Sequence, residues 1–474
     1  MTIASSHAED TCLKNRLSSD EPEAKLPRDP KNENEAVEIK KPSASADTPS
    51  SPSADATHEE ERETYPEGGL QAWLVVFGSF CAMGAIFGLV NSAGVFESYF
   101  QRNQLSNYSH ANIGWIFSLY LFLVFFIGVQ VGPVFDTYGP RALVAAGSLV
   151  TVTSLMLLSL SKSYYQIMLT YSVLGGIGGA LLNAPAYGAV AHFFNERRGL
   201  ATGIASTAGG IGGIVFPLLL QFLLGDNGVG FPWACRILGF IFLGLCVPAN
   251  LFICSRLPPK LGPDGRPKVQ SVWPDFTIFR DRGFAMATLA IFFMEWGLFV
   301  PLTYIVSYAV AHGHSESDSS KLLSVLNAGS VVGRFLPGLL ADKFGRFNII
   351  ILTNAMCAVS AFALWLPSAH SGAVLIVFCV FFGFVSGSNL GLYPVCLGQF
   401  CESQAYGRYF ATASMMASFG TLTSLPIGGS LLGLGGARGW NALIAFSGSA
   451  YLGALACYIS ARVGVVGWDV RRKF

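Results

Sequence analysis

The sequence predicts an all-α polytopic membrane protein, with twelve transmembrane helices in two six-helix halves. Of its 474 residues, 52% are hydrophobic and only 12% are charged, whereas a soluble globular chain carries about a quarter charged residues. The apolar residues gather in runs of about 20, the length of a helix that crosses a bilayer. A similar phrase closes two of these runs, as GPVFDTYGPR at 132–141 and as GLLADKFGRF at 338–347. Such repetition is typical of a multi-helix unit that is used twice.

The N-terminal segment, residues 1–64, differs in composition from the rest of the chain. It is rich in Ser, Glu, Lys, Pro and Ala and has almost no aromatic side chains. Such a segment buries too little apolar surface to offset the entropy lost on ordering. We therefore expect a disordered cytosolic tail.

Twelve apolar runs follow, six on each side of a polar stretch. The first six lie at 71–95, 112–134, 141–161, 165–190, 200–224 and 236–256. The second six lie at 283–309, 321–340, 347–366, 372–394, 408–432 and 440–460. We expect an N-terminal six-helix bundle at 65–256, a cytoplasmic central loop at 257–282, a C-terminal six-helix bundle at 283–462 and a short cytosolic tail at 463–474.

Lys and Arg set the expected orientation. They are concentrated in the loops that follow even-numbered spans, for example Arg197, Arg198, Arg256 and Lys343. By the positive-inside rule, these loops, both termini and both copies of the phrase are cytoplasmic. Asn107 begins a glycosylation sequon, NYS, in the first loop, which this topology places outside.

Several classes of function are not indicated. The ten cysteines are scattered, with no CxxC pair and no His at ligand spacing, so we expect buried hydrophobes and no metal or redox site. The glycine clusters at 175–179 and 209–213 lie within apolar runs and lack the Lys-Ser/Thr of a phosphate loop, so they indicate close helix packing. With no ATP site, cofactor motif, nucleic-acid signal or catalytic set, the sequence predicts gradient-driven transport and not an enzyme.

The two phrases are similar to the loop motif of the major facilitator superfamily, which joins the second span to the third and, in weaker form, the eighth to the ninth. The resemblance covers the chain from about residue 65 to its end. Each copy places a carboxylate at a helix end beside a tight turn and a basic residue, so the cluster can pair in one conformation and separate in another. A hydrophilic turn that only ends two helices is the alternative. The expected gate residues are Gly132, Asp136, Gly139, Arg141, Gly338, Asp342, Gly345 and Arg346.

Two further stretches, EGGLQAW at 67–73 and FFNERRGLATG at 193–203, resemble the signatures of the monocarboxylate transporter family in its fungal branch. The resemblance implies a monomeric carrier in the lipid bilayer whose partners are a small organic solute and protons. It also implies a plasma-membrane location, with the vacuolar membrane as the alternative.

Arg334 lies roughly 18 Å along the eighth expected span, at a rise of about 1.5 Å per residue. A cation there costs about 2.5–3.5 kcal/mol, so it must face a cavity and meet an anion or carbonyls. Asn327 and Ser330 share its helix face. The resemblance implies that Arg334 holds a substrate carboxylate, but Ser330 replaces the family's Asp and Asn91 replaces a lysine. A larger solute or a different coupling is therefore open, and Arg334 can instead lock its helix to a neighbour such as Glu295.

Other polar or aromatic residues within the spans are candidates. Glu295, about halfway along the seventh span, either carries a coupling proton or pairs with Arg334. The stretch 382–386 resembles the region where the family tunes substrate size, which makes Phe382 a cavity wall and Ser386 a polar contact, with packing as the alternative. Polar residues in the fourth and tenth spans are expected to contact solute or to join helices; they are Asn183, Tyr187, Asn389 and Tyr393.

The predicted function is secondary active transport of a small organic solute, a monocarboxylate or related organic acid, coupled to protons. The two halves are expected to rock about a site near the middle of the bilayer. Export of a secondary metabolite is the alternative direction. A membrane sensor that binds a solute and signals through its tail is the alternative class.

Overall fold

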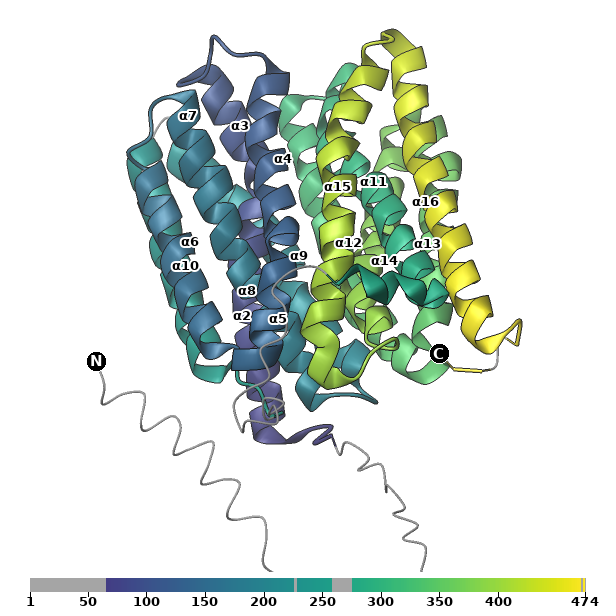
Figure 1. Cartoon of the computed structure of the whole chain (residues 1–474). Coiled ribbons are helices and arrows are strands. Elements are labelled where there is room, and N and C mark those ends of the chain that lie inside the picture. The colour runs from purple at the N-terminus through teal and green to yellow at the C-terminus, as the bar shows by residue number, and fades with distance from the viewer. Residues whose placement is uncertain (1–64, 226–227, 258–274, 470–471, 474) are drawn as a thin grey trace, which may run out of the picture. The chain divides into compact units, whose positions relative to one another are not determined.

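The computed structural model describes residues 65–225, 228–257, 275–469 and 472–473. These residues form helices and turns and no β-strand (Figure 1). The expected tail at 1–64 and residues 258–274 of the expected central loop lie outside the described ranges.

The N-terminal half contains the first six predicted spans. Three of them are built from more than one helical segment, with breaks at Ser92 and Ile127 and a π-helical stretch in the fourth span. The segments are α2 (Gly69–Asn91), α3 (Ala93–Arg102), α4 (His110–Phe126), α5 (Gly128–Tyr138), α6 (Arg141–Leu158), α7 (Tyr164–Ile167), η1 (Met168–Leu174), α8 (Gly175–Phe193), α9 (Arg198–Leu224) and α10 (Phe231–Phe252).

The C-terminal half contains the other six spans. Its segments are η2 (Phe276–Arg280), α11 (Arg282–Ala311), α12 (Glu316–Phe344), α13 (Arg346–Ser360), η3 (Ala361–Trp365), η4 (Leu366–His370), α14 (Gly372–Leu397), η5 (Ser403–Ala405), α15 (Tyr406–Leu432) and α16 (Gly436–Val466). Helix α12 begins before the predicted residue 321 because the Ser315 hydroxyl caps it, accepting the N–H of Asp318 at 3.1 Å. Helix α16 runs past the predicted end at 462.

Eleven segments of the described chain are long and apolar enough to cross a membrane. Helix α15 is the remaining predicted span, and its 27 residues include many Ser, Thr and Gly. It packs against α4 and α5 of one half and against α11 and α16 of the other. Because protein surrounds much of α15, it needs fewer apolar side chains than a lipid-facing helix does.

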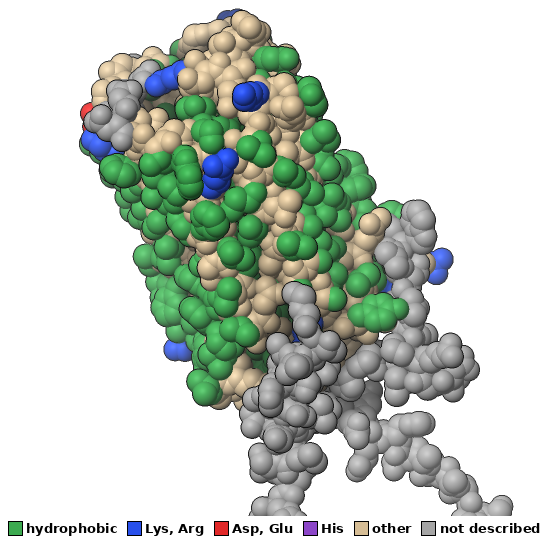
Figure 2. All heavy atoms as spheres, turned by 90° about the vertical axis from the view of Figure 1, so that its left-hand side faces the viewer, with side chains coloured by type: hydrophobic (Ala, Val, Ile, Leu, Met, Phe, Trp, Pro, Cys, Tyr) green, Lys and Arg blue, Asp and Glu red, His purple; other side chains and the backbone are tan. Residues whose placement is uncertain are grey.

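The side of the bundle formed by α6 and α10 is covered mainly by apolar side chains, with few charged ones (Figure 2). Leu149 and Leu157 of α6 and Phe240 and Val247 of α10 are among the exposed residues. A largely apolar surface on membrane-length helices is the surface that contacts lipid.

The two halves meet through α9 against α12 and through α15 against α4 and α5. Glycines allow α9 and α12 to touch: a Cβ on Gly203 would lie 2.5 Å from the carbonyl oxygen of Arg334, and one on Gly338 would lie 2.5 Å from that of Gly199. The predicted close packing of the two glycine clusters is confirmed, because a Cβ on Gly178 would lie 2.4 Å from the Thr151 hydroxyl and one on Gly210 would lie 2.8 Å from a methyl group of Val331. The loops with the two repeated phrases lie at one end of this interface, which we call the motif end.

Candidate functional site

A small cavity lies between the two halves, within the membrane-spanning part of the bundle. Its volume is about 30 Å³, room for about one water molecule, so the halves must separate to admit an organic solute. The apolar lining residues are Phe87, Val90, Leu121, Phe125, Leu298, Phe299, Leu302, Leu326 and Leu390. The polar lining residues are Asn91, Asn327, Ser330, Arg334 and Ser386, all of which the sequence indicates as candidate solute contacts.

Arg334 is the only one of these polar residues with a charge, and its side chain is 4% exposed. Its Nε donates to the Ser330 hydroxyl at 3.2 Å, and its Nη1 donates to the carbonyl oxygen of Ser206 at 2.6 Å. Among the described residues, no carboxylate forms an ion pair with it. A buried cation held only by neutral acceptors retains a strong preference for an anion.

Asn91 and Asn327 are fixed in the same manner, although one lies on α2 and the other on α12. The Nδ2 group of Asn91 donates to Phe87 in its own helix at 2.8 Å and to Gly209 of α9 at 3.1 Å. The Nδ2 group of Asn327 donates within α12 at 3.1 Å and to Gly213 of α9 at 3.2 Å. Both amides are thus fastened to carbonyl groups on successive turns of α9.

The glycine-rich face of α9 makes this arrangement possible. A Cβ on Gly209 would lie 2.6 Å from Nη1 of Arg334, and a Cβ on Gly213 would lie 2.7 Å from Cγ of Asn327. Any larger residue would displace these side chains. The sequence predicts close packing for the glycine cluster at 209–213. It does not show that the polar side chains of the cavity pack against these glycines.

Glu295 of α11 is 1% exposed, and its Oε2 oxygen has no hydrogen-bond partner in the described part of the chain. It faces α15, where a Cβ on Gly420 would lie 3.6 Å from the Glu295 Cβ. Glu295 and Arg334 do not form an ion pair in this conformation. Of the two expectations for Glu295, the pairing with Arg334 is not observed.

Two of the candidate residues in the tenth span lie away from the cavity, inside the C-terminal half. Phe382 is fully buried, and its ring stacks on that of Phe378 with a centroid separation of 5.2 Å. The Asn389 side-chain oxygen accepts hydrogen bonds from Thr353 and Asn354 of α13, both at 3.2 Å. Phe382 therefore fits the packing alternative, and Asn389 fits the helix-joining alternative.

A layer of aromatic rings lies between the cavity and the motif end. Phe410 of α15 is at its centre, with ring centroids 5.0 Å from Tyr187, 6.0 Å from Tyr393 and 5.9 Å from Tyr406. Tyr187 therefore joins the N-terminal half to the C-terminal half in this layer and is not part of the cavity lining. Asn183, one turn away in α8, is buried, and no described residue forms a hydrogen bond with its Oδ1.

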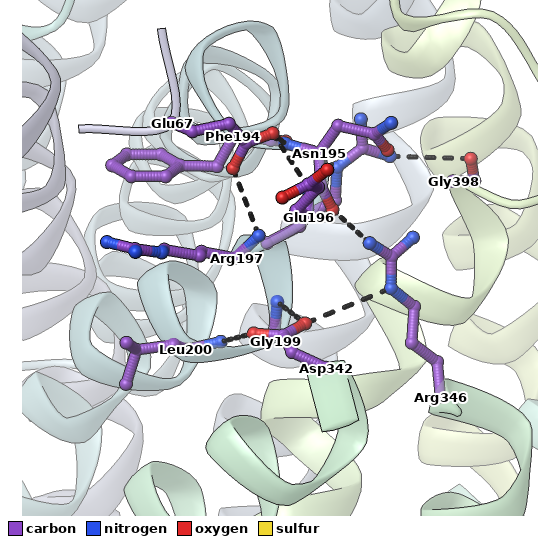
Figure 3. Close-up of polar contacts among 11 residues, drawn as sticks. Glu67, Phe194, Asn195, Glu196, Arg197, Gly199, Leu200, Asp342, Arg346 and Gly398 are labelled. Carbon is purple, nitrogen blue, oxygen red and sulfur yellow. Dashed lines mark hydrogen bonds and ion pairs between the residues drawn. The ribbon is translucent and has the colours of Figure 1, made fainter. Parts of the chain in front are cut away.

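At the motif end, the aspartates of the two phrases cap helices of the opposite half. Asp136 accepts the backbone N–H groups of Gly407 and Arg408, at 2.9 and 2.8 Å, at the start of α15. Asp342 accepts those of Gly199 and Leu200, both at 2.8 Å, at the start of α9 (Figure 3). A carboxylate at a helix N-terminus satisfies unpaired N–H groups and the positive end of the helix dipole.

The glycines of the phrases have two distinct tasks. Gly139 and Gly345 have φ angles of +78° and +96°, which favour glycine, and form the turns that end α5 and α12. Gly132 and Gly338 allow contact between halves, because a Cβ on either would lie 2.2 or 2.5 Å from a backbone carbonyl oxygen of α15 or α9.

The basic residues of the two phrases differ in their surroundings. Arg346 is buried, lies 4.0 Å from Asp342 and donates to the carbonyl oxygen of Asn195 in the opposite half. Arg141 is exposed at the start of α6. The second phrase thus bonds across the interface through its basic residue as well as through its aspartate.

The two stretches that carry the family resemblance lie in contact. The Glu67 carboxylate accepts the backbone N–H groups of Asn195 and Glu196 at 2.7 Å and that of Arg197 at 3.1 Å (Figure 3). Nearby, the rings of Trp73 and Phe194 are 5.3 Å apart. Glu67 therefore organises the α8–α9 loop, a role that sequence reasoning misses because its partners are backbone groups.

Ser403 of η5 is a second junction between the halves. Its carbonyl oxygen is 3.0 Å from Nε2 of His192, and its hydroxyl accepts from Nη2 of Arg198 at 3.1 Å. The hydroxyl of Tyr65, just before α2, lies 2.7 Å from the same Ser403 oxygen. The chain entering the first span thus also contacts the C-terminal half.

Outside the spans, Asp275 forms an ion pair with Arg408 at 3.1 Å, within the C-terminal half. Hydrogen bonds from Thr277, together with the nearby Arg408, hold the pKa of the Asp275 carboxyl below its ordinary value. Asn107 is exposed in the loop between α3 and α4. No group of three or more His, Cys, Asp or Glu residues in the described ranges can hold a metal ion.

Comparisons with known proteins agree with this architecture. The sequence model of the Major Facilitator Superfamily matches residues 70–416. The MFS-type transporter opdF of Penicillium oxalicum is 40% identical over 86% of this chain and 94% of its own length. The riboflavin transporter MCH5 of Saccharomyces cerevisiae is 35% identical over 86% and 81%, and the fujikurins efflux protein of Gibberella fujikuroi is 35% identical over 91% and 90%. The human organic anion transporter MFSD10 has the same fold, with a TM-score of 0.62 at 15% identity over 82% of this chain and all of that one.

Proposed function

Since this chain belongs to the major facilitator superfamily, we propose that it is a secondary active transporter of an amphipathic organic acid. The observation that carries the proposal is Arg334, a buried cation that lines a cavity between the halves and has no anionic partner among the described residues. An acidic group would neutralise it, and the apolar lining would receive the rest of the solute. The likeness of residues 67–73 and 193–203 to monocarboxylate transporter signatures also supports an acid.

Transport would proceed by alternating access, with the motif end on the cytoplasmic side. The support is the excess of Lys and Arg in the loops at that end. The caps formed by Asp136 and Asp342 would hold this side closed, and their separation would open it. In this scheme, the described conformation is the one closed toward the cytoplasm.

Glu295 is the proposed site of proton coupling. Its carboxyl is buried, no described residue forms an ion pair with it, and an unpaired charge inside a membrane is costly. Glu295 would therefore lose its proton only in a conformation that admits water to α11.

Export of a secondary metabolite is the favoured direction. The fujikurins efflux protein is named for export and shares most of its length with this chain. In the cavity, Ser330 and Asn91 stand where the resembled family has an Asp and a Lys. The cavity therefore lacks two ionisable groups of that family. The riboflavin transporter shows that relatives are also named for other solutes.

The decisive experiment is reconstitution of the full chain with Arg334→Ala, followed by counterflow of labelled organic acids. Loss of a charge-assisted contact in a buried site costs about 2–3 kcal/mol, so uptake of a transported acid should fall about thirtyfold or more. The matched control is Arg236→Ala, because Arg236 stacks on Trp233 at 5.1 Å and does not line the cavity. Equal acid transport by wild type and Arg334→Ala contradicts the proposal.

A membrane sensor is the competing class, and removal of residues 1–64 separates the two. A carrier keeps its flux without the tail, whereas a sensor binds its solute and loses its output. Measured flux in the truncated protein therefore supports the carrier.

A further inference from the structure

Asn91 and Asn327 present only hydrogen-bond acceptors to the cavity. An amide has two N–H groups, and each of these residues donates both, one within its own helix and one to α9. The Oδ1 oxygen is the group that remains for a solute. Within the described ranges neither oxygen accepts a hydrogen bond, and neither is sealed off inside the protein.

The anchors of the three main polar groups follow one another along α9. Arg334 binds the carbonyl of Ser206, Asn91 that of Gly209 and Asn327 that of Gly213. At about 1.5 Å per residue, these anchors extend over roughly 10 Å. The cavity thus has a cation at one end of a short row and two acceptor oxygens along the rest of it.

On the basis of the proposed organic-acid function, we propose that the solute also carries N–H or O–H donors within roughly 10 Å of its acidic group, and that Asn91 and Asn327 accept them. This chemistry describes hydroxylated or amide-bearing acids with an apolar body. Simple aliphatic monocarboxylates lack these donors and would leave both oxygens without partners. A site built to hydrogen-bond a solute rejects analogues that lack the group, since its own buried polar atoms then stay unpaired.

Two probes of equal charge test this: caffeate, an aromatic acid with two hydroxyl groups at the end away from its carboxylate, and its dimethyl ether. Methylation removes the donors and keeps the acid and the ring. Titration calorimetry on the purified full chain in nanodiscs should show caffeate binding about tenfold more tightly or better. In Asn327→Leu one of the two acceptor oxygens is lost. The affinity of caffeate relative to that of its dimethyl ether should therefore be smaller than in the wild type.

The outcomes are distinct for the two proposals. If neither acid binds, the organic-acid function itself is overturned. If both bind with equal affinity, the function stands and the donor requirement is wrong. If caffeate is preferred equally by wild type, Asn327→Leu and Asn91→Leu, the assignment to these two residues is wrong. The comparison of probes on wild-type protein decides the donor requirement even if a variant fails to fold.

Discussion

Replacing Asp342 with Asn should weaken closure of the motif end. The carboxylate accepts two backbone N–H groups at the start of α9, both at 2.8 Å. Each N–H group donates to a different carboxylate oxygen, whereas an Asn side chain has only one oxygen and no charge to interact with the helix dipole. A hydrogen bond to a charged group contributes about 1.5–3 kcal/mol, so the closed state should lose about 2 kcal/mol.

This loss corresponds to an approximately thirtyfold change in population, because 1.36 kcal/mol is tenfold. A closed-to-open ratio of about 100 to 1 would become about 3 to 1, a change that distance measurements detect. Spin labels at Arg197 and Lys343 suit the assay, because both residues are exposed at the motif end and lie on opposite halves. Electron–electron resonance should then show a second, longer distance in Asp342→Asn.

Two variants calibrate that result. Asp136→Asn removes the equivalent cap on α15 and should shift the distances by a similar amount. Asp275→Asn breaks the 3.1 Å ion pair with Arg408 inside the C-terminal half. It should therefore leave the distance between the labels on the two halves unchanged. An unaltered distance distribution in Asp342→Asn, with normal folding, would refute the gate role of the caps.

Four further substitutions have defined outcomes. Gly209→Ala and Gly213→Ala should each abolish most transport while the protein still folds, because the new methyl displaces Arg334 or Asn327; Gly244→Ala, whose Cβ would meet nothing within 4 Å, is the control in the same flux assay. Glu67→Gln should destabilise the fold by about 1–2 kcal/mol, since the carboxylate caps three N–H groups, and thermal unfolding measures this. Glu295→Gln should make transport independent of pH, and an unchanged pH profile would contradict proton carriage by Glu295.

The spans were predictable because eleven of them are long apolar runs, and the repeated phrase correctly marks equivalent helix ends in the two halves. The polar lining of the cavity was also predictable in large part. Arg334 and Asn327 are costly in a membrane, so their presence in an apolar run already indicates a cavity. Phe382 was less predictable, because an aromatic side chain fits a cavity wall and a packed interior equally well.

The partners of these residues were not predictable. Asp136 and Asp342 bind backbone N–H groups, and Arg334 binds the carbonyl of Ser206. Backbone groups are the same at every position, so no residue type in the sequence identifies them. Glu295 was a reasonable partner for Arg334 by charge. However, the glycine-rich face of α9 brings the carbonyl of Ser206 close to Arg334, and this carbonyl takes the place of the carboxylate.

The fastening of Arg334 and Asn327 to α9 has a consequence for the transport cycle. Both residues belong to the C-terminal half, while the carbonyls they bind belong to the N-terminal half. A solute that takes hydrogen bonds from the guanidinium therefore competes with a bond that joins the halves. If Arg334 binds the solute as proposed, occupancy of the cavity weakens the contact between the halves, and in the empty carrier the same cation holds the halves together.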